Sequence, residues 1–146
     1  IVGGSDIVIG SDTAQFFDPH VDFGLVAALE PISMSRKMPL GEILRVSLMG
    51  LEERIGAKRA YEIGLISEIT TPEKLWDRAH ELAAKIAAKP SVSTQGTVRA
   101  IWESLEMGRH VALSRGLSYT QIGNEQGIAQ AENRLKTGNR LPYEVR

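Results

Sequence analysis

The sequence contains no cysteine, no long hydrophobic run and no marked excess of either charge. Without cysteine the chain has no disulfide framework and no thiolate chemistry, which fits a reducing compartment and predicts a cytoplasmic location. No apolar run approaches the ~20 residues that a membrane-spanning helix requires. The start, Ile1-Val2-Gly3-Gly4, lacks the basic residues and the long apolar core of a secretory signal peptide. The sequence therefore predicts no membrane span.

Charge and composition narrow the classes of protein further. The 146 residues carry a formal net charge of −1, which leaves no electrostatic footprint for binding nucleic acid or a membrane surface. Hydrophobic residues make up 42% and charged residues 24%, values typical of a globular protein. By its length the chain is expected to form one domain, and it contains no internal repeat. Since the first residue is not Met, we expect the chain to be part of a longer one.

The first 27 residues have the pattern of extended structure. An apolar run at Ile7–Ile9 ends at Gly10-Ser11-Asp12, and a second run around Phe16 ends at Asp18-Pro19. Two short apolar runs separated by turn residues predict a strand, a turn and a second strand. A further strand is predicted at 65–69, where apolar and polar residues alternate. So few strands leave an open sheet edge, and we expect their partners upstream of the first residue.

Helix is predicted over most of the chain from Pro31 onward. Proline, glycine and capping residues bound the expected helices at 39–50, 57–63 and 71–90. A last helical segment is expected from Gly108 to about Leu135, broken or weakened at Gly116, Gly123 and Gly127. Two apolar stripes are expected to be buried: Leu75, Ala79, Leu82, Ala83 and Ile86, and then Val98, Ile101, Trp102 and Leu105.

Five segments carry a recognisable series of motifs. They are the strand pattern ending at Asp18-Pro19, then Asp22-Phe23-Gly24-Leu25, the stretch 48–60 with Gly50, Ile55, Ala57 and Ala60, the stretch 61–69 with Gly64-Leu65, and the helix end Ala87-Ala88-Lys89-Pro90. They are similar to the patterns N-x-G-L, L-x-T-G-x-x-I-x-A-x-x-A, G-L-V and A-x-x-P of the enoyl-CoA hydratase/isomerase (crotonase) family. In one order and one spacing, they resemble roughly the C-terminal half of a crotonase subunit.

The resemblance implies an α/β fold, the crotonase/ClpP-like spiral of ββα turns, here its C-terminal part with a mainly helical oligomerisation region. Residues 1–89 are expected to form part of the core, and residues 90–146 a helical trimerisation region. It also implies an acyl-CoA thioester as ligand, a homo-oligomer (trimer or hexamer) and a role in fatty acid metabolism. No cofactor is expected, since CoA is part of the substrate, and no metal.

In this family two backbone N–H groups bind the thioester oxygen as enolate charge develops on it, which forms an oxyanion hole. By alignment on Asp6, the family's first catalytic Glu would fall immediately before Ile1, and neither oxyanion donor is assignable here. We therefore expect part of the active site outside this chain, in a missing N-terminal half that is linked in cis or is a separate chain. Gly3-Gly4 are interpreted as strand-entry glycines.

His20 stands where the family has its second catalytic Glu. Because an imidazole exchanges protons near neutral pH, His20 is the first candidate catalytic residue, and the alternative is a surface histidine after a strand. Asp18 and Asp22 flank it at two-residue spacing, which in extended structure puts all three on one side. Either acid can then orient the ring, although Asp18 before Pro19 is also a common turn residue.

A second departure from the family is Val26-Ala27-Ala28-Leu29-Glu30-Pro31, where many members have a glycine-rich P-G-x-G-G-T stretch. Bulkier residues predict a narrower or reshaped pocket. Glu30 either supplies the missing carboxylate or is a solvated acid at a helix start. Arg134 and Lys136 match a region where the family binds CoA phosphates or adenine, and the alternative is a solvated basic helix end.

Three hypotheses about function follow. The first is a crotonase-family acyl-CoA enzyme, similar to an enoyl-CoA hydratase/isomerase (a lyase or isomerase), with hydratase, isomerase and hydrolase activity open and His20, Asp22 and Glu30 as candidate catalytic residues. The second is a non-catalytic crotonase relative that serves as a structural or CoA-binding subunit. The third is an unrelated small α+β module, which would fold alone as a monomer.

Overall fold

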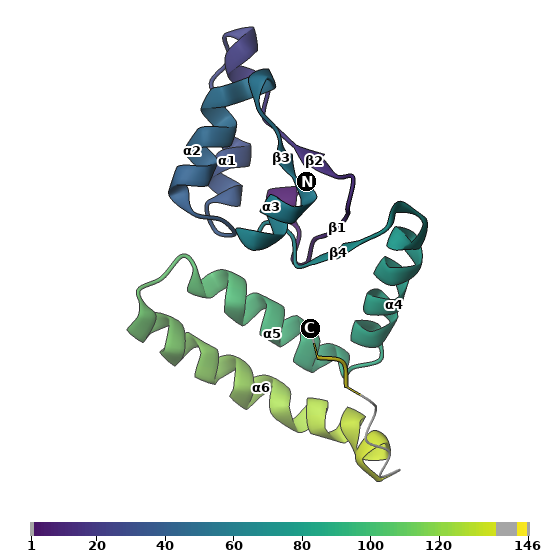
Figure 1. The fold of residues 1–146 in the computed structure, drawn as a ribbon. Helices are drawn as coiled ribbons and strands as arrows, with labels where there is room; N and C mark the ends of the chain where they lie inside the picture. Colours follow the sequence, from purple (N-terminus) through teal and green to yellow (C-terminus); the bar gives the residue numbers. More distant parts are fainter. Residues whose placement is uncertain (1, 137–142, 146) are drawn as a thin grey trace. The chain divides into compact units, whose positions relative to one another are not determined.

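The computed structural model describes residues 2–136 and 143–145, with only the backbone given at 133–135. The chain forms two compact units, Ile1–Glu81 (unit 1) and Leu82–Arg146 (unit 2). Figure 1 shows short strands and helices in unit 1 and long helices in unit 2. The division falls inside a helix, a few residues before the boundary predicted at 89.

Unit 1 contains two separate pairs of strands. Strand β1 (Ile9–Ser11) pairs in parallel with β4 (Glu68–Thr70), with Ile9 opposite Glu68. Strand β2 (Gln15–Phe16) pairs in antiparallel with β3 (Ile55–Gly56). The predicted strand–turn–strand is present, but β1 and β2 bond to different partners rather than to each other.

Most helices of unit 1 begin and end at the positions that the capping residues of the sequence predicted. They are α1 (Leu29–Met34), α2 (Leu40–Met49) and α3 (Ala57–Glu62). Gly50 ends α2 and Gly64 follows α3, both with positive φ, so these two helix ends are confirmed. The first helix begins at Leu29 rather than at the predicted Pro31.

Short 3-10 helices replace part of the extended structure predicted for the first 27 residues. These are η1 (Val2–Gly4) and η2 (His20–Phe23), and two further 3-10 helices, η3 (Gly50–Glu52) and η4 (Pro72–Lys74), lie later in the chain. Gly3-Gly4 therefore lie in a helical turn and are not strand-entry glycines. Gly3 is buried against α1, where a Cβ atom would lie 2.7 Å from Cβ of Ser33, so the close packing of η1 on α1 requires glycine.

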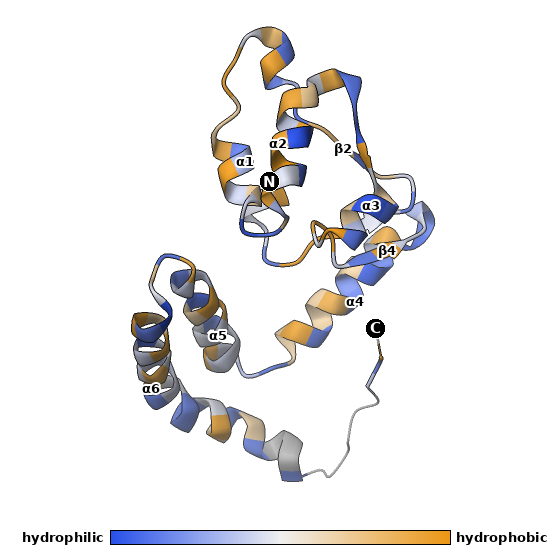
Figure 2. Ribbon diagram, turned by 60° about the vertical axis from the view of Figure 1, so that its left-hand side comes forward, coloured by the Kyte–Doolittle hydropathy of each residue, from blue (hydrophilic) through white to orange (hydrophobic). Residues whose placement is uncertain are grey.

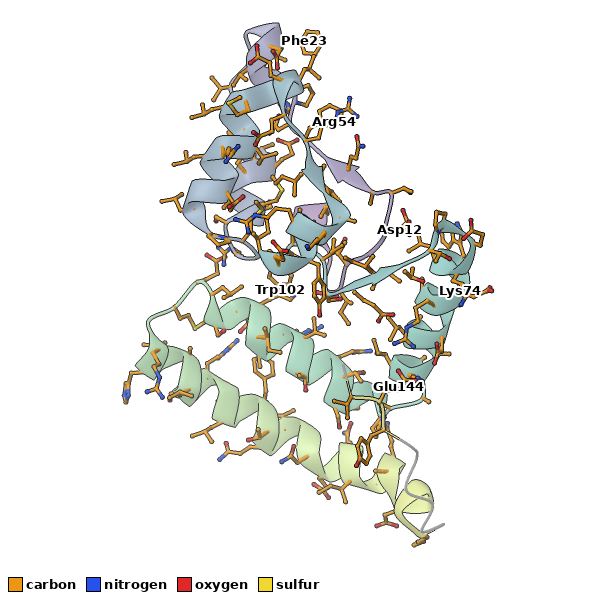
Figure 3. All side chains as sticks on the ribbon, in the orientation of Figure 1. Asp12, Phe23, Arg54, Lys74, Trp102 and Glu144 are labelled. Atoms are coloured by element: carbon orange, nitrogen blue, oxygen red, sulfur yellow. The ribbon has the colours of Figure 1, made fainter. Side chains whose placement is uncertain are left out.

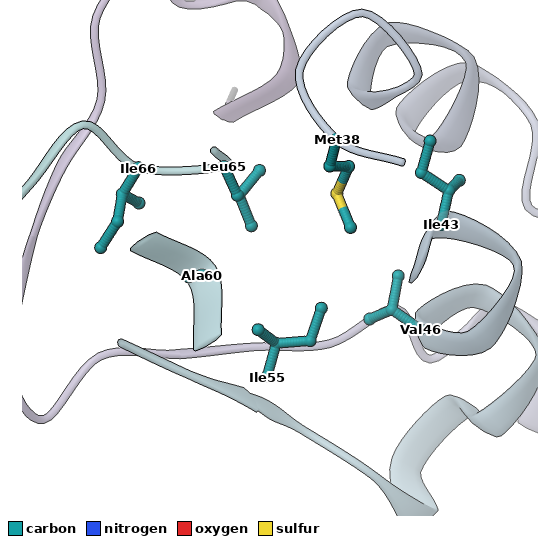
Figure 4. Close-up of a cluster of buried hydrophobic side chains, with 7 residues drawn as sticks. All are labelled: Met38, Ile43, Val46, Ile55, Ala60, Leu65 and Ile66. Carbon is teal, nitrogen blue, oxygen red and sulfur yellow. The ribbon is translucent and has the colours of Figure 1, made fainter. Parts of the chain in front are cut away.

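The hydrophobic core of unit 1 joins α2, β3, α3 and the loop after α3. Figure 4 shows its seven buried side chains, which are Met38, Ile43, Val46, Ile55, Ala60, Leu65 and Ile66. Other apolar residues of α1 and α2 are exposed in this chain and include Leu29, Ile32, Leu40, Leu44 and Leu48. Figure 2, which colours the ribbon by hydropathy, shows orange segments on both helices. The core fixes the inner faces of α2 and α3 and leaves their outer faces open.

Helix α4 (Leu75–Ala87) follows Pro72–Lys74, which confirms the predicted start at Thr71-Pro72. Its predicted buried stripe is not buried in this chain: Leu82 is half-buried and Ile86 is exposed. Arg78 joins the first part of α4 to β4, because Nε and Nη2 donate to the two carboxylate oxygens of Glu68 at 2.7 and 3.1 Å.

Unit 2 is built on the hairpin of α5 (Ser91–Ser104) and α6 (Arg109–Lys136). The extent predicted for the last helix is confirmed, but its glycines do not break it. A Cβ atom at Gly127 would lie 2.3 Å from Oγ of Ser93, so the glycine lets the two helices approach closely. Within the described residues, no helix combines the length and the apolar character needed to cross a bilayer.

Candidate functional site

A cavity of about 540 Å³ opens in unit 1 beside the hydrophobic core. Its apolar wall comes from β2 and β3, α1 and α2, and the segments that join them, and includes Phe16, Met34, Met38, Val46, Ile55 and Leu65. Its ionisable wall consists of Asp18, His20 and Glu30. An apolar hollow with a few convergent polar groups is the usual form of a small-molecule site.

Asp18 and His20 are joined by two hydrogen bonds at this wall. The backbone N–H of His20 donates to Oδ1 of Asp18 at 3.1 Å, and Nδ1 of the His20 ring lies 2.5 Å from the same oxygen. Asp18 follows β2, and Pro19 turns the chain into η2, which begins at His20. Asp18 is 5% exposed and the His20 side chain 33% exposed, so the acid is buried beneath an accessible imidazole.

The environment of His20 favours its protonated form. The hydrogen bond to Asp18 raises the pKa of His20 above 6.5, the partial burial of the ring lowers it, and the charges of Asp18 and Glu30 raise it further. The other oxygen of Asp18, Oδ2, is buried and has no partner among the described residues. A buried carboxylate with one unpaired oxygen is costly unless a cation lies beside it, and the His20 ring is in that position.

Glu30 lies in the first turn of α1 and lines the same cavity as His20. Its place in the first helical turn is the one predicted for a helix-start acid. Its carboxylate also raises the pKa of His20 by electrostatic attraction. The structure thus brings two of the three candidate catalytic residues to one cavity.

Asp22 points elsewhere. Its Oδ2 accepts the backbone N–H of Leu51 at 2.7 Å, and it is not among the residues that line the cavity. The expectation that Asp18, His20 and Asp22 share one side was wrong, because η2 replaces the extended backbone that it assumed. In a helical turn, residues two apart face different directions.

Arg134 and Lys136 belong to unit 2, near the end of α6. The side chain of Arg134 lies outside the described residues. Lys136 is exposed and its Nζ lies 3.3 Å from Oε2 of Glu132, one helical turn earlier. This pair is a solvated i,i+4 ion pair, whose contribution to stability is small. Among the described residues, no group of three potential metal ligands comes together.

The residue that the sequence reasoning undervalued is Asp18, which was expected mainly as a turn residue. The available signal was the spacing Asp18-Pro19-His20, in which proline restricts the acid and an Asx turn brings its oxygen to the residue two positions on. The depth of its burial had no signal in the sequence, because it depends on the packing of segments that are distant along the chain.

Comparison with known proteins identifies the family. The family model described as enoyl-CoA hydratase/isomerase matches residues 3–133. The chain belongs to the enoyl-CoA hydratase/isomerase family. A crystal structure of an enoyl-CoA hydratase/isomerase from Mycobacterium paratuberculosis superposes with a TM-score of 0.88 at 39% identity, over 97% of this chain. The predicted crotonase-type α/β fold, here its mainly helical C-terminal part, is thereby confirmed.

Two further relatives are less similar in sequence. Enoyl-CoA hydratase domain-containing protein 3, mitochondrial, from Rattus norvegicus is 33% identical over 88 residues, 60% of this chain and 29% of the rat protein. (E)-Benzylidenesuccinyl-CoA hydratase from Thauera aromatica is 30% identical over 118 residues, 80% of this chain and 44% of that protein. The chain covers 56% of the Mycobacterium paratuberculosis structure, so it spans about half the length of its family relatives or less.

Proposed function

We propose that the chain is part of an acyl-CoA enzyme of the hydratase/isomerase type, in which His20 exchanges a proton with the bound acyl thioester. One observation carries this proposal. His20, at the motif position of a family catalytic acid, lies on the wall of a largely apolar cavity of about 540 Å³ with its ring bonded to buried Asp18. The family relatives named above support the same class of ligand by their names.

The chemistry requires a group that takes and returns a proton next to the thioester. With Nδ1 engaged by Asp18, Nε2 is the ring nitrogen left to exchange a proton with the α-carbon or with a water molecule in the cavity. A positioned group of this kind contributes roughly 10²–10⁴-fold to rate. Glu30, on the same wall, is proposed as a second acid–base group, whereas Asp22 is proposed to contribute only through its bond to Leu51, which holds the turn that carries His20.

The rest of the site is proposed to come from outside this chain, in cis or as a separate chain. The oxyanion donors and the first catalytic acid expected from the family have no counterpart among the residues assigned here, and relatives are about twice as long. We further propose a homo-oligomer, trimer or hexamer, that binds CoA only as part of its substrate. A cytoplasmic location remains a prediction from the lack of cysteine, whereas the rat relative is named as mitochondrial.

A second candidate function is a non-catalytic, CoA-binding or structural subunit of the same family. It is favoured by the two departures at the site, His20 in place of a carboxylate and Val26-Ala27-Ala28 in place of a glycine-rich stretch. Both departures lie at or near the cavity. They are therefore consistent with a protein that has lost catalytic activity as well as with one that catalyses a different reaction.

An acyl-CoA panel on the complete protein separates the two. We expect turnover of at least one thioester, a loss of at least roughly 100-fold in kcat for His20→Ala, and none for the matched His110→Ala on the exposed face of α6. Turnover that survives His20→Ala would remove His20 from the site, and no turnover of any thioester would favour the subunit function. Residues 1–146 by themselves are expected to be inactive, because losing even one oxyanion donor costs about 10²–10³ in rate.

A further inference from the structure

We propose that Asp18 is a positioning residue, whose Oδ1 keeps a proton on Nδ1 of His20 and thereby makes Nε2 the nitrogen that exchanges protons with the ligand in the cavity. This inference rests on the proposed function of His20. The sequence left Asp18 and Asp22 as alternative partners of the ring, and the hydrogen bonds of the two residues favour Asp18.

The hydrogen bonds of Asp18 hold the His20 ring in one orientation. One carboxylate oxygen accepts both the backbone N–H and the ring nitrogen of the same histidine, at 3.1 and 2.5 Å. Two bonds from one oxygen to one residue restrict the rotation of the His20 side chain. The Asp18 side chain is only 5% exposed, which limits the competition of water for its oxygens.

The identity of the acceptor decides the tautomer. An ionised carboxylate accepts hydrogen bonds and donates none, so the Nδ1 that faces it must carry the hydrogen. In the neutral ring Nε2 then has the free lone pair, and the structure records no partner for Nε2 among the described residues. His20 lines the cavity with its side chain one-third exposed, so a ligand there can reach the ring.

A turn role alone does not account for these observations. An Asx turn explains the bond from the backbone N–H of His20 to Asp18, and asparagine makes that turn as well as aspartate. It explains neither the bond to the ring nor the burial of a carboxylate whose Oδ2 has no partner. Those two features are expected where the acid serves to hold a cationic or proton-accepting ring.

Other charges near His20 are few. Glu30 faces it across the cavity and acts in the same direction as Asp18. On α2, which packs against η2, Glu42 is bonded to Arg59 and Arg45 to Glu53. Asp22 of η2 is bonded to the backbone of Leu51, Glu52 of η3 is exposed, and Arg54 lies over the ring of Phe17. Asp18 is therefore the group whose replacement changes the ring directly.

The test uses Asp18→Asn in the complete protein, with nitrogen-15-labelled histidine. Asparagine keeps the size and the Asx turn but can donate to Nδ1, which removes the preference for a proton there. In the unaltered protein we expect neutral His20 to carry its hydrogen on Nδ1. In Asp18→Asn we expect mixed or Nε2-protonated tautomers, a kcat lower by about 10²–10⁴-fold with a smaller change in KM, and the limb of the kcat–pH profile that reports the His20 pKa moved to lower pH.

Three further measurements keep the proposal falsifiable. Asp12→Asn, in the exposed turn after β1 and labelled in Figure 3, is the matched control and should leave tautomer and kcat unchanged. Asp18→Glu, which retains a carboxylate, should recover part of the activity. If His20→Ala abolishes turnover while Asp18→Asn keeps both the tautomer and kcat, the positioning role is wrong; if His20→Ala is active, the proposed function of His20 fails instead.

Discussion

The carboxylate of Asp22 lies so close to Gly50 that a Cβ atom at Gly50 would be 1.8 Å from Oδ2. The same oxygen accepts the N–H of Leu51 at 2.7 Å, so η2 and η3 are joined through one side chain and two backbone positions. Gly50 also has φ of 58° and ψ of −125°, a conformation that only glycine adopts readily. The end of α2 thus requires glycine at position 50.

Gly50→Ala is expected to lower the free energy of unfolding by about 1–3 kcal/mol, because it adds backbone strain and displaces Asp22. Urea unfolding followed by circular dichroism measures the change. Gly41→Ala is the matched control: Gly41 lies in α2 with open space around its Cα, and alanine there should stabilise by about 0.5–1 kcal/mol. The expectation would be contradicted if Gly50→Ala did not lower the free energy of unfolding relative to Gly41→Ala.

Asp22 offers a direct test of a structural against a catalytic role. Asp22→Ala removes the acceptor for Leu51 and should cost about 0.5–1.5 kcal/mol of stability, whereas Asp22→Asn keeps an acceptor oxygen and should cost less. From the geometry we expect the kcat of the Asn variant to stay close to that of the unaltered protein. A loss of roughly 100-fold or more in that variant would instead support the catalytic role predicted from the sequence.

Local signals predicted local structure, and the errors came from non-local packing. Gly50 and Gly64 identified two helix ends because a C-terminal cap is decided within a few residues. Strand partners are not decided locally, so nothing in the sequence indicated that β1 would pair with β4 rather than with β2. The continuity of α6 follows from its packing on α5, where Gly127 meets Ser93 and close contact compensates for the low helix propensity of glycine.

The candidate site shows the same division. The motif position of His20 and the helix-start position of Glu30 were readable from the sequence, and both residues line the cavity. The direction of Asp22 was not, because it depends on a 3-10 turn at 20–23 and on the backbone of Leu51 in a distant segment. The burial of Asp18 likewise depends on packing that no local pattern reports.

Stability should depend on pH through His20. Its folded pKa is raised above 6.5, so the folded state binds the proton more tightly than the unfolded state. This contribution is fully present below pH 6.5 and is lost as pH rises through the folded pKa. The difference in urea midpoint between the unaltered protein and His20→Gln should therefore shrink as pH rises from 6 to 9. His110→Gln provides the reference, and a difference that grows with pH would contradict the sign.

Self-association should use the apolar stripe of α5. Val98, Ile101 and Leu105 remain 40%, 59% and 48% exposed in the chain, so their burial requires another surface. We expect the complete protein to sediment as a trimer or hexamer and Ile101→Asp with Leu105→Asp to weaken association at least roughly tenfold, since each such side chain contributes about 1.5–3 kcal/mol when buried. Arg99→Asp, on another face of α5, is the control; a monomer at all concentrations would rule the proposal out.

Arg134 and Lys136 are expected to hold CoA phosphates if their family match reflects function. Replacing both with Ala should then weaken CoA binding by the complete protein, and added salt should narrow the difference, since exposed charges are screened over about 8–10 Å at moderate ionic strength. Lys58→Ala, at an exposed position of α3, controls for general loss of charge. Calorimetric titration of CoA into both forms of the protein at two salt concentrations measures this difference in affinity. Unchanged affinity at low salt would leave these residues as a basic helix end, worth a few tenths to ~1 kcal/mol of stability.

The parallel pairing of β1 with β4 has a consequence for how the chain is made. The carbonyl oxygen of Val8 accepts hydrogen bonds from both the backbone N–H and the hydroxyl of Ser67, which lies 59 residues later. At about 5–20 residues per second, the ribosome needs roughly 3–12 s to deliver the second strand after the first. During that interval the β1 edge has no partner, so nascent unit 1 is exposed to chaperones and to neighbouring nascent chains until synthesis has passed β4.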